Sequence, residues 1–128
     1  MYKVQFYVFG QLNQYYAEAS IFVYQSVAVT GETFGLAPLE AMAWGCVPVV
    51  SEITCFKDFI NHESNGLIFD HRDKNAVKLL RKTIERLQND TNLRTNLARK
   101  ALEVRNTHSV SNIASLFLKE FERMLNGD

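Results

Sequence analysis

Residues 32–50 read Glu-Thr-Phe-Gly-Leu-Ala-Pro-Leu-Glu-Ala-Met-Ala-Trp-Gly-Cys-Val-Pro-Val-Val, and this stretch decides the fold. Pro38 suits the first turn of a helix, where its missing N–H costs nothing, and Gly45 supplies the left-handed residue that ends a helix. The β-branched run from Val47 to Val50 has the length of a strand that is buried on both faces. The stretch therefore predicts a loop, a short helix that ends at Gly45, and a buried strand.

The start of this helix has the features of an anion site. Gly35 has no side chain, so a ligand could approach the backbone closely, and the first N–H groups of a helix carry partial positive charge. Glu32 and Glu40 bracket the site, eight positions apart. Each carboxylate also has an ordinary explanation: Glu32 as a solvated loop residue, and Glu40 as an acid that favours the positive helix end.

Length and composition bound the class of protein. With 128 residues, 47% of them hydrophobic, the chain can form one compact domain. Fourteen basic and fourteen acidic side chains cancel, so no overall charge favours nucleic acid. Cys46 and Cys55 form neither a disulfide scaffold nor a zinc site, and no apolar run could cross a bilayer. In the absence of a signal peptide, we expect a soluble cytoplasmic domain.

Strands and helices alternate along the first 70 residues, which predicts a Rossmann-like α/β fold with a parallel sheet and helices on both faces. The segment Ile21–Tyr24 is apolar throughout, which indicates a central strand. The strands are expected at Val4–Phe9, Ile21–Tyr24, Val47–Ser51 and Gly66–Phe69, with helices at Gln11–Ala19, after Gly35 and at Phe56–Asn61.

Beyond Asp73 the pattern is helical. Asp73 is a plausible N-cap for a helix that reaches Leu87, Asp90-Thr91 can cap the next helix, and Ser109 or Ser111 can begin the last. The expected apolar positions of these helices are Val77, Leu80, Ile84 and Leu87, then Leu93, Leu97, Ala101 and Val104, then Ile113, Leu116, Phe117, Phe121 and Met124. The aromatic residues of the last helix are typical of a core.

The stretch at 32–50 resembles the signature of the retaining GT-B glycosyltransferases of group 1, a family that includes glycogen synthases, sucrose synthases and mannosyltransferases. Two glutamates stand at Glu-x7-Glu spacing, Phe34-Gly35-Leu36 lies between them, and Glu-Ala-Met-Ala closes the motif. The rest of the chain is similar to the family in its order of elements. Val4–Gly10 resembles a strand that ends in Phe-x-Gly, and Asn65–Phe69 resembles the strand that follows the site.

The resemblance implies transfer of a sugar from a UDP-, GDP- or ADP-linked donor to a carbohydrate or lipid-linked acceptor. The anomeric configuration would be retained, with no metal and no other cofactor. Glu32 would be the catalytic residue beside the donor sugar, and Glu40 would bind the ribose hydroxyls. The other donor-binding residues that the resemblance implies are Thr33, Phe34, Gly35 and Leu36, facing the sugar and diphosphate, and Gly10, Gln11 and Leu12, near the base.

The sequence departs from the family pattern at several places. Thr33 replaces a glycine, Thr54-Cys55 replaces a Gly-Gly pair, and Asp58 stands where a glutamate is usual. The resemblance also implies that residues 1–128 form one partial donor domain, without the acceptor domain and without the Arg and Lys that grip the donor phosphates. We therefore expect rearranged strand pairing, self-association or an N-terminal partner fragment at the edge of Ile21–Tyr24.

Further expectations concern location and alternative functions. A lipid-linked acceptor would bring the protein to the inner face of a membrane, and the last helix would expose Phe117 and Phe121 where the family packs the missing domain. One alternative is a non-catalytic module of the same ancestry that binds a partner protein. Another is a general Rossmann nucleotide-binding domain, which the lack of a Gly-x-Gly-x-x-Gly run disfavours.

Overall fold

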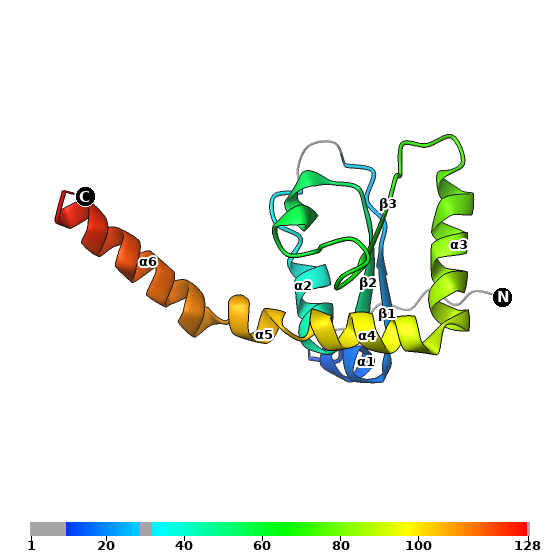
Figure 1. The fold of residues 1–128 in the computed structure, drawn as a ribbon, viewed down its shortest axis with the longest axis horizontal. Coiled ribbons are helices and arrows are strands. Elements are labelled where there is room, and N and C mark those ends of the chain that lie inside the picture. Colours follow the sequence, from blue (N-terminus) through cyan, green and yellow to red (C-terminus); the bar gives the residue numbers. More distant parts are fainter. Residues whose placement is uncertain (1–9, 29–31, 128) are drawn as a thin grey trace.

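The computed structural model describes residues 10–28 and 32–127, and these form an α/β fold (Figure 1). The expected strand at Val4–Phe9 and the end of the loop before Glu32 lie outside the described residues. The strands are β1 (Ile21–Tyr24), β2 (Val47–Ser51) and β3 (Leu67–Phe69). The helices are α1 (Leu12–Glu18), α2 (Leu36–Ala43), α3 (Ala76–Asn89), α4 (Thr91–Ala101), α5 (Val104–Thr107) and α6 (Val110–Leu125), with a 3₁₀ helix at Thr54–Asp58.

The three strands form a parallel sheet in the order β1-β2-β3. Ile21 lies opposite Val47, and Val49 lies opposite Leu67, so β2 pairs on both of its edges. In the described sheet β1 is an outer strand, and because the strand expected at Val4–Phe9 lies outside the described residues, the central position of Ile21–Tyr24 stays a prediction. Its apolar side chains reflect packing on its two faces, which says nothing about the pairing of its edges.

Helices cover both faces of the sheet, as predicted. Because side chains alternate along a strand, Val50 of β2 packs into a cluster with Leu39 and Met42 of α2, while Val47 and Val49 pack with Leu87 of α3 and Leu97 of α4. Figure 1 shows α2 and α3 on opposite sides of the sheet, and α4 passing across one end of it. All five residues of β2 are buried, which confirms the strand predicted to be buried on both faces.

Several helix ends follow the predicted signals. Gly45 adopts the left-handed conformation, with φ of 87°, just after α2. The Asp90 carboxylate accepts a hydrogen bond of 2.8 Å from the Leu93 N–H and caps α4. Ser109 caps α6 in the same way, because its hydroxyl oxygen accepts from the Asn112 N–H at 3.1 Å. These short side chains satisfy N–H groups that a helix start leaves without a partner.

Three local predictions need correction. The helix expected at Phe56–Asn61 is a shorter 3₁₀ helix that begins at Thr54. Asp73 does not cap α3, because its carboxylate accepts instead from the Asn75 N–H at 2.6 Å, and this turn delays the helix start to Ala76. The delay places Val77 in the first turn with its side chain 84% exposed, away from the apolar face.

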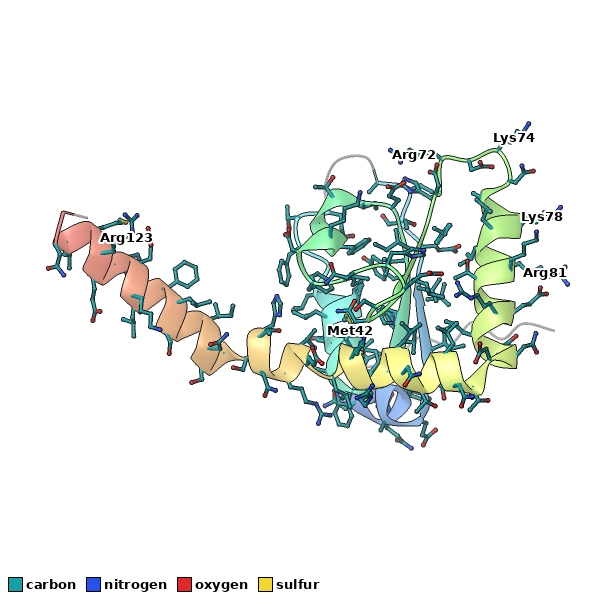
Figure 2. All side chains as sticks on the ribbon, in the orientation of Figure 1. Met42, Arg72, Lys74, Lys78, Arg81 and Arg123 are labelled. Atoms are coloured by element: carbon teal, nitrogen blue, oxygen red, sulfur yellow. The ribbon has the colours of Figure 1, made fainter. Side chains whose placement is uncertain are left out.

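The outer face of α3 is basic and exposed, as expected of a solvated helix face. Figure 2 shows Lys74, Lys78 and Arg81 extending outward from α3 and the loop before it, whereas Met42 lies inside the fold. Arg81 pairs with Glu85 at 2.7 Å, an exposed i,i+4 pair worth a few tenths of a kcal/mol.

The last helix, α6, leads away from the sheet (Figure 1), and none of its residues is buried. Phe117 is 59% exposed and Phe121 is 53% exposed, so their assignment to a core is wrong and the expectation that they are exposed is confirmed. The two rings pack on one another at 6.2 Å between centroids. Among the described helices, none combines the length and apolar character needed to cross a membrane.

Candidate functional site

Glu32 is held in place by the last residue of β1. The Tyr24 hydroxyl donates a hydrogen bond of 3.0 Å to Glu32 Oε2, and both side chains are partly buried. This hydrogen bond, followed by burial, raises the pKa of Tyr24, so the phenol remains a donor. The sequence analysis did not identify Tyr24; a tyrosine at the carboxyl end of a strand, before the glutamate loop, was the available signal.

The segment after Glu32 forms an exposed loop that ends at the start of α2. Thr33 and Phe34 are exposed, and the Phe34 ring packs against Phe59 with 5.4 Å between centroids. Gly35 is buried and left-handed, with φ of 80°, and a Cβ at this position would collide with the Phe56 ring. A glycine at position 35 is therefore required by packing, and the close approach of a ligand there stays a prediction.

The N-terminal end of α2 retains its partial positive charge. Gly35 provides no side-chain cap, and the first turn of the helix contains no acidic residue. Glu40 is the fifth residue of α2, so the ordinary explanation of Glu40 as an acid at the positive helix end does not apply. The N–H groups of Leu36 and Ala37 have no partner within the helix, and they can bind an anion.

Glu40 lines a hollow of about 360 Å³ together with residues from the beginning of the described chain. The hollow includes Gly10 and Leu12, two of the three residues expected near a nucleotide base. Gln11, the third, is exposed beside them as the N-cap of α1 and does not line the hollow. The lining residues are Gly10, Leu12, Asn13, Tyr16, Glu40, Ala43 and Trp44.

Helix α1 is held by contacts with Cys46, which lies between α2 and β2, and with Phe22 of β1. The Cys46 thiol donates to the backbone oxygens of Tyr16 and Ala19 at 3.3 and 3.4 Å, and the Tyr16 ring packs edge-on against Phe22. Burial raises the pKa of the Tyr16 phenol, and the nearby Glu40 carboxylate raises it further. Tyr16 also shares a buried cluster with Ala41 of α2, so the beginning of the described chain lies near Glu40.

The structure places the two glutamates beside different tyrosines: Glu32 contacts Tyr24, and Glu40 lies near Tyr16. Among the residues that depart from the family pattern, Cys55 is buried, and its thiol pKa is raised first by this burial and then by the Glu32 and Asp58 carboxylates. Both cysteines are buried and free of a disulfide, and burial raises the pKa of Cys46 as well.

No group of three His, Cys, Asp or Glu side chains in the described residues could hold a metal ion.

Residues 2–104 match a family described as "Glycosyl transferases group 1". A comparison with curated proteins gave no match. Among solved structures, the chain is similar to sucrose-phosphate synthase from Thermosynechococcus elongatus, at 25% identity and a TM-score of 0.72. That alignment covers 89% of this chain and 27% of the synthase.

Two further structures share the fold. HepE from Anabaena, solved in complex with UDP and also with UDP and glucose, is 18% identical with a TM-score of 0.70, over 85% of this chain and 29% of HepE. The C-terminal domain of the group 1 family glycosyl transferase LpcC from Francisella tularensis is 22% identical with a TM-score of 0.63, over 81% of this chain and 51% of that domain. The chain therefore spans about half or less of each of these structures.

Proposed function

The chain belongs to the group 1 glycosyl transferases, and on this premise we propose that it binds the nucleotide-sugar donor of an enzyme that transfers a sugar. The observation that carries the proposal is the hollow in which Glu40 meets Gly10 and Leu12, thirty and twenty-eight positions earlier in the chain. The volume of the hollow, about 360 Å³, lies in the range of small-molecule sites. The UDP complexes of HepE support a nucleotide as the ligand.

In this proposal the nucleoside occupies the Glu40 hollow. Glu40 is exposed on α2, so its carboxylate is free to accept hydrogen bonds from both ribose hydroxyls, and such charge-assisted bonds are about twice as strong as neutral ones. The base lies over Gly10, Gln11 and Leu12. The indole of Trp44, 42% exposed at the border of the hollow, offers the base a flat surface.

The diphosphate is placed at the N-terminal end of α2, at the backbone N–H groups around Leu36. During transfer the bond between the sugar C1 and the diphosphate oxygen breaks, and the oxygen of an acceptor hydroxyl forms the new bond to C1. The leaving diphosphate takes the electron pair, and its oxygen accepts the proton that the acceptor hydroxyl gives up. Helix N–H groups that already point at the leaving oxygen stabilise the charge that develops there.

Glu32, held by Tyr24, is placed beside the donor sugar as the catalytic carboxylate. We propose retention of the anomeric configuration, no metal or other cofactor, and a carbohydrate or lipid-linked acceptor. The cytoplasm, where nucleotide sugars are substrates, is the proposed location. A lipid-linked acceptor would bring the enzyme to the inner face of a membrane.

Replacement of Glu40 by alanine tests the proposal. We expect the affinity for UDP, measured by calorimetry, to fall at least about tenfold, because a charged hydrogen-bond acceptor is lost. The circular dichroism spectrum and the unfolding midpoint should not change, because Glu40 is exposed.

Glu122→Ala, which removes another exposed helical glutamate, is the matched control and should bind UDP as the unmodified chain does. An equal affinity of Glu40→Ala and Glu122→Ala would remove Glu40 from the ribose role.

A second candidate function, a partner-binding module without catalysis, is favoured by the exposed apolar side chains of α6. Phe117, Phe121 and Met124 are each more than half exposed. Such a module has no need of the Glu32–Tyr24 contact or of the Glu40 hollow. It would therefore bind no nucleotide, and Glu40→Ala would have no effect.

A further inference from the structure

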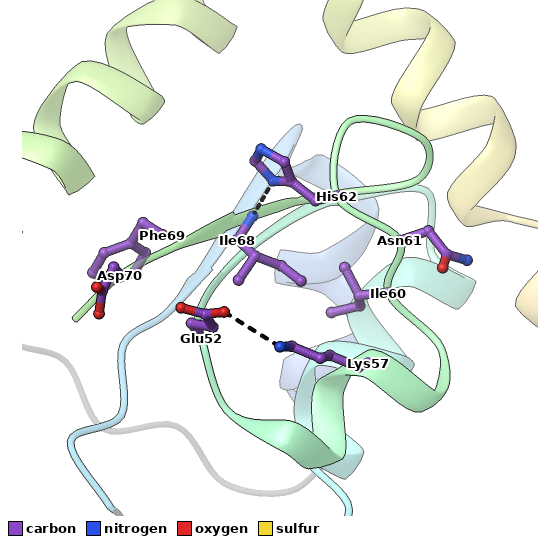
Figure 3. A pocket seen from close by; sticks show the side chains of 8 residues that line it. All are labelled: Glu52, Lys57, Ile60, Asn61, His62, Ile68, Phe69 and Asp70. Carbon is purple, nitrogen blue, oxygen red and sulfur yellow. Dashed lines mark hydrogen bonds and ion pairs between the residues drawn. The ribbon is translucent and has the colours of Figure 1, made fainter. Parts of the chain in front are cut away.

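A second hollow, of about 450 Å³, lies beside the outer strand β3 and shares no lining residue with the Glu40 hollow (Figure 3). Its apolar lining comes from Ile60, Ile68 and Phe69, and the remaining lining residues carry polar side chains. The lining residues are Glu52, Lys57, Ile60, Asn61, His62, Ile68, Phe69 and Asp70. The proposed donor site uses none of them.

The loop on one side of this hollow is fixed by side-chain hydrogen bonds. His62 Nδ1 accepts from the Ile68 N–H at 2.9 Å (Figure 3), so the proton of the neutral ring is on Nε2, which can donate to a ligand. Asn65 accepts from the Asn61 N–H at 2.7 Å and donates to the Phe59 carbonyl at 2.9 Å. These contacts close the turn that carries Asn61 and His62.

Two carboxylates on the other side pair with exposed cations. Glu52 accepts from Lys57 at 3.3 Å and from Arg72 at 2.9 Å. Arg72 also donates to Asp70 at 3.2 Å, so one guanidinium orients both acids from outside the hollow. Each carboxylate has more lone pairs than these bonds use, and the Lys57 ammonium has two further donors.

The balance of positive and negative charge around the hollow favours one class of ligand. Glu52 and Asp70 are offset by Lys57 and Arg72, so the hollow has no excess charge to attract an anion or a cation. It does present donors and acceptors close together around apolar side chains. A sugar ring has the complementary chemistry, because each hydroxyl both donates and accepts, while its C–H faces are apolar.

We propose that this hollow is a saccharide-binding site, separate from the donor site, that takes a neutral di- or oligosaccharide. In a sugar-transferring enzyme, such a site would hold a glycan chain at the edge of the sheet, outside the reacting centre. Binding there does not depend on nucleotide binding, so the two proposals can fail separately.

Amide NMR of the ¹⁵N-labelled full chain tests the site, with maltose, cellobiose, lactose and α-1,6-mannobiose as probes at millimolar concentrations. We expect at least one disaccharide to shift the amides of Asn61, His62, Ile68 and Asp70 and to leave those of Gly10–Leu12 unchanged. Inorganic phosphate should shift none of these four. Glu52→Gln and Asp70→Asn should each weaken the disaccharide about tenfold, because a charged acceptor becomes neutral.

Glu85→Gln is the matched control, since Glu85 is also an exposed acid paired with an arginine but lies on α3, outside the hollow. This variant should bind as the unmodified chain does. The proposal is overturned if no disaccharide shifts these four amides, if the shifts occur at Thr33–Leu36 instead, or if phosphate binds at the hollow. Equal affinities of Glu52→Gln, Asp70→Asn and Glu85→Gln would also overturn it.

Discussion

Replacing Gly35 with alanine is expected to lower the free energy of unfolding by about 3 kcal/mol. Two costs combine: a residue with a side chain is strained at a φ of 80°, by roughly 1–2 kcal/mol, and the new Cβ overlaps the Phe56 ring. Overpacking of a well-filled core costs a further 1–3 kcal/mol or so. Urea unfolding followed by circular dichroism measures the sum.

Alanine substitutions at two other glycines separate the backbone strain from the overpacking. Gly45 has a similar φ of 87°, but its Cβ would meet Leu102 at an ordinary 3.6 Å, so Gly45→Ala should show only the backbone strain. Gly10 has no described atom within 4 Å of its Cβ position, so Gly10→Ala should change stability little. A loss for Gly35→Ala no larger than that for Gly45→Ala would contradict the packing role given to Phe56.

Replacing Phe56 with alanine is expected to cost about 4 kcal/mol, in the usual range for a large-to-small substitution in a core. Phe56 is fully buried, and its ring packs edge-on against Tyr24 and Phe59 at 5.8 and 6.4 Å between centroids. The stability of a small domain is about 5–15 kcal/mol, so this loss would leave the fold marginal. The shift of the midpoint of urea unfolding measures this loss of stability.

Phe56→Leu is the control, because it keeps most of the apolar volume and should cost clearly less. The double variant Gly35→Ala/Phe56→Ala should lose less stability than the two single losses combined, since without the ring the new Cβ has space. Strict additivity would show that the two residues do not interact. A cost of Phe56→Ala below about 1 kcal/mol would contradict the core position of the ring.

The parts of the fold that follow local rules could be predicted from the sequence. Pro38 and Gly45 delimited α2, the apolar run identified β2, and Asp90 and Ser109 capped their helices as expected. Each of these signals depends on residues within one turn or one strand. Asp73 failed as a cap because its carboxylate had a second local partner, the Asn75 N–H, and the sequence does not decide between two such turns.

Long-range packing could not be predicted. The collision that requires Gly35 to lack a side chain involves Phe56, twenty-one residues later, and the position of β1 at the outside of the described sheet depends on pairing between strands. The site residues Tyr24 and Tyr16 were missed for the same reason, because each reaches Glu32 or Glu40 only after the chain has folded. Trp44 was missed although it follows Glu40 by one helical turn, a spacing that the sequence itself shows.

The central claim is that this chain binds a nucleotide between α1 and α2. Titration of the ¹⁵N-labelled chain with UDP, GDP and ADP, followed by amide NMR, tests this claim most directly. We predict that one of the three shifts the amides of Gly10–Leu12, Phe34–Leu36 and Glu40–Trp44, and that the effective nucleotide identifies the base. A well-dispersed spectrum in which none of the three nucleotides shifts these amides would contradict the account.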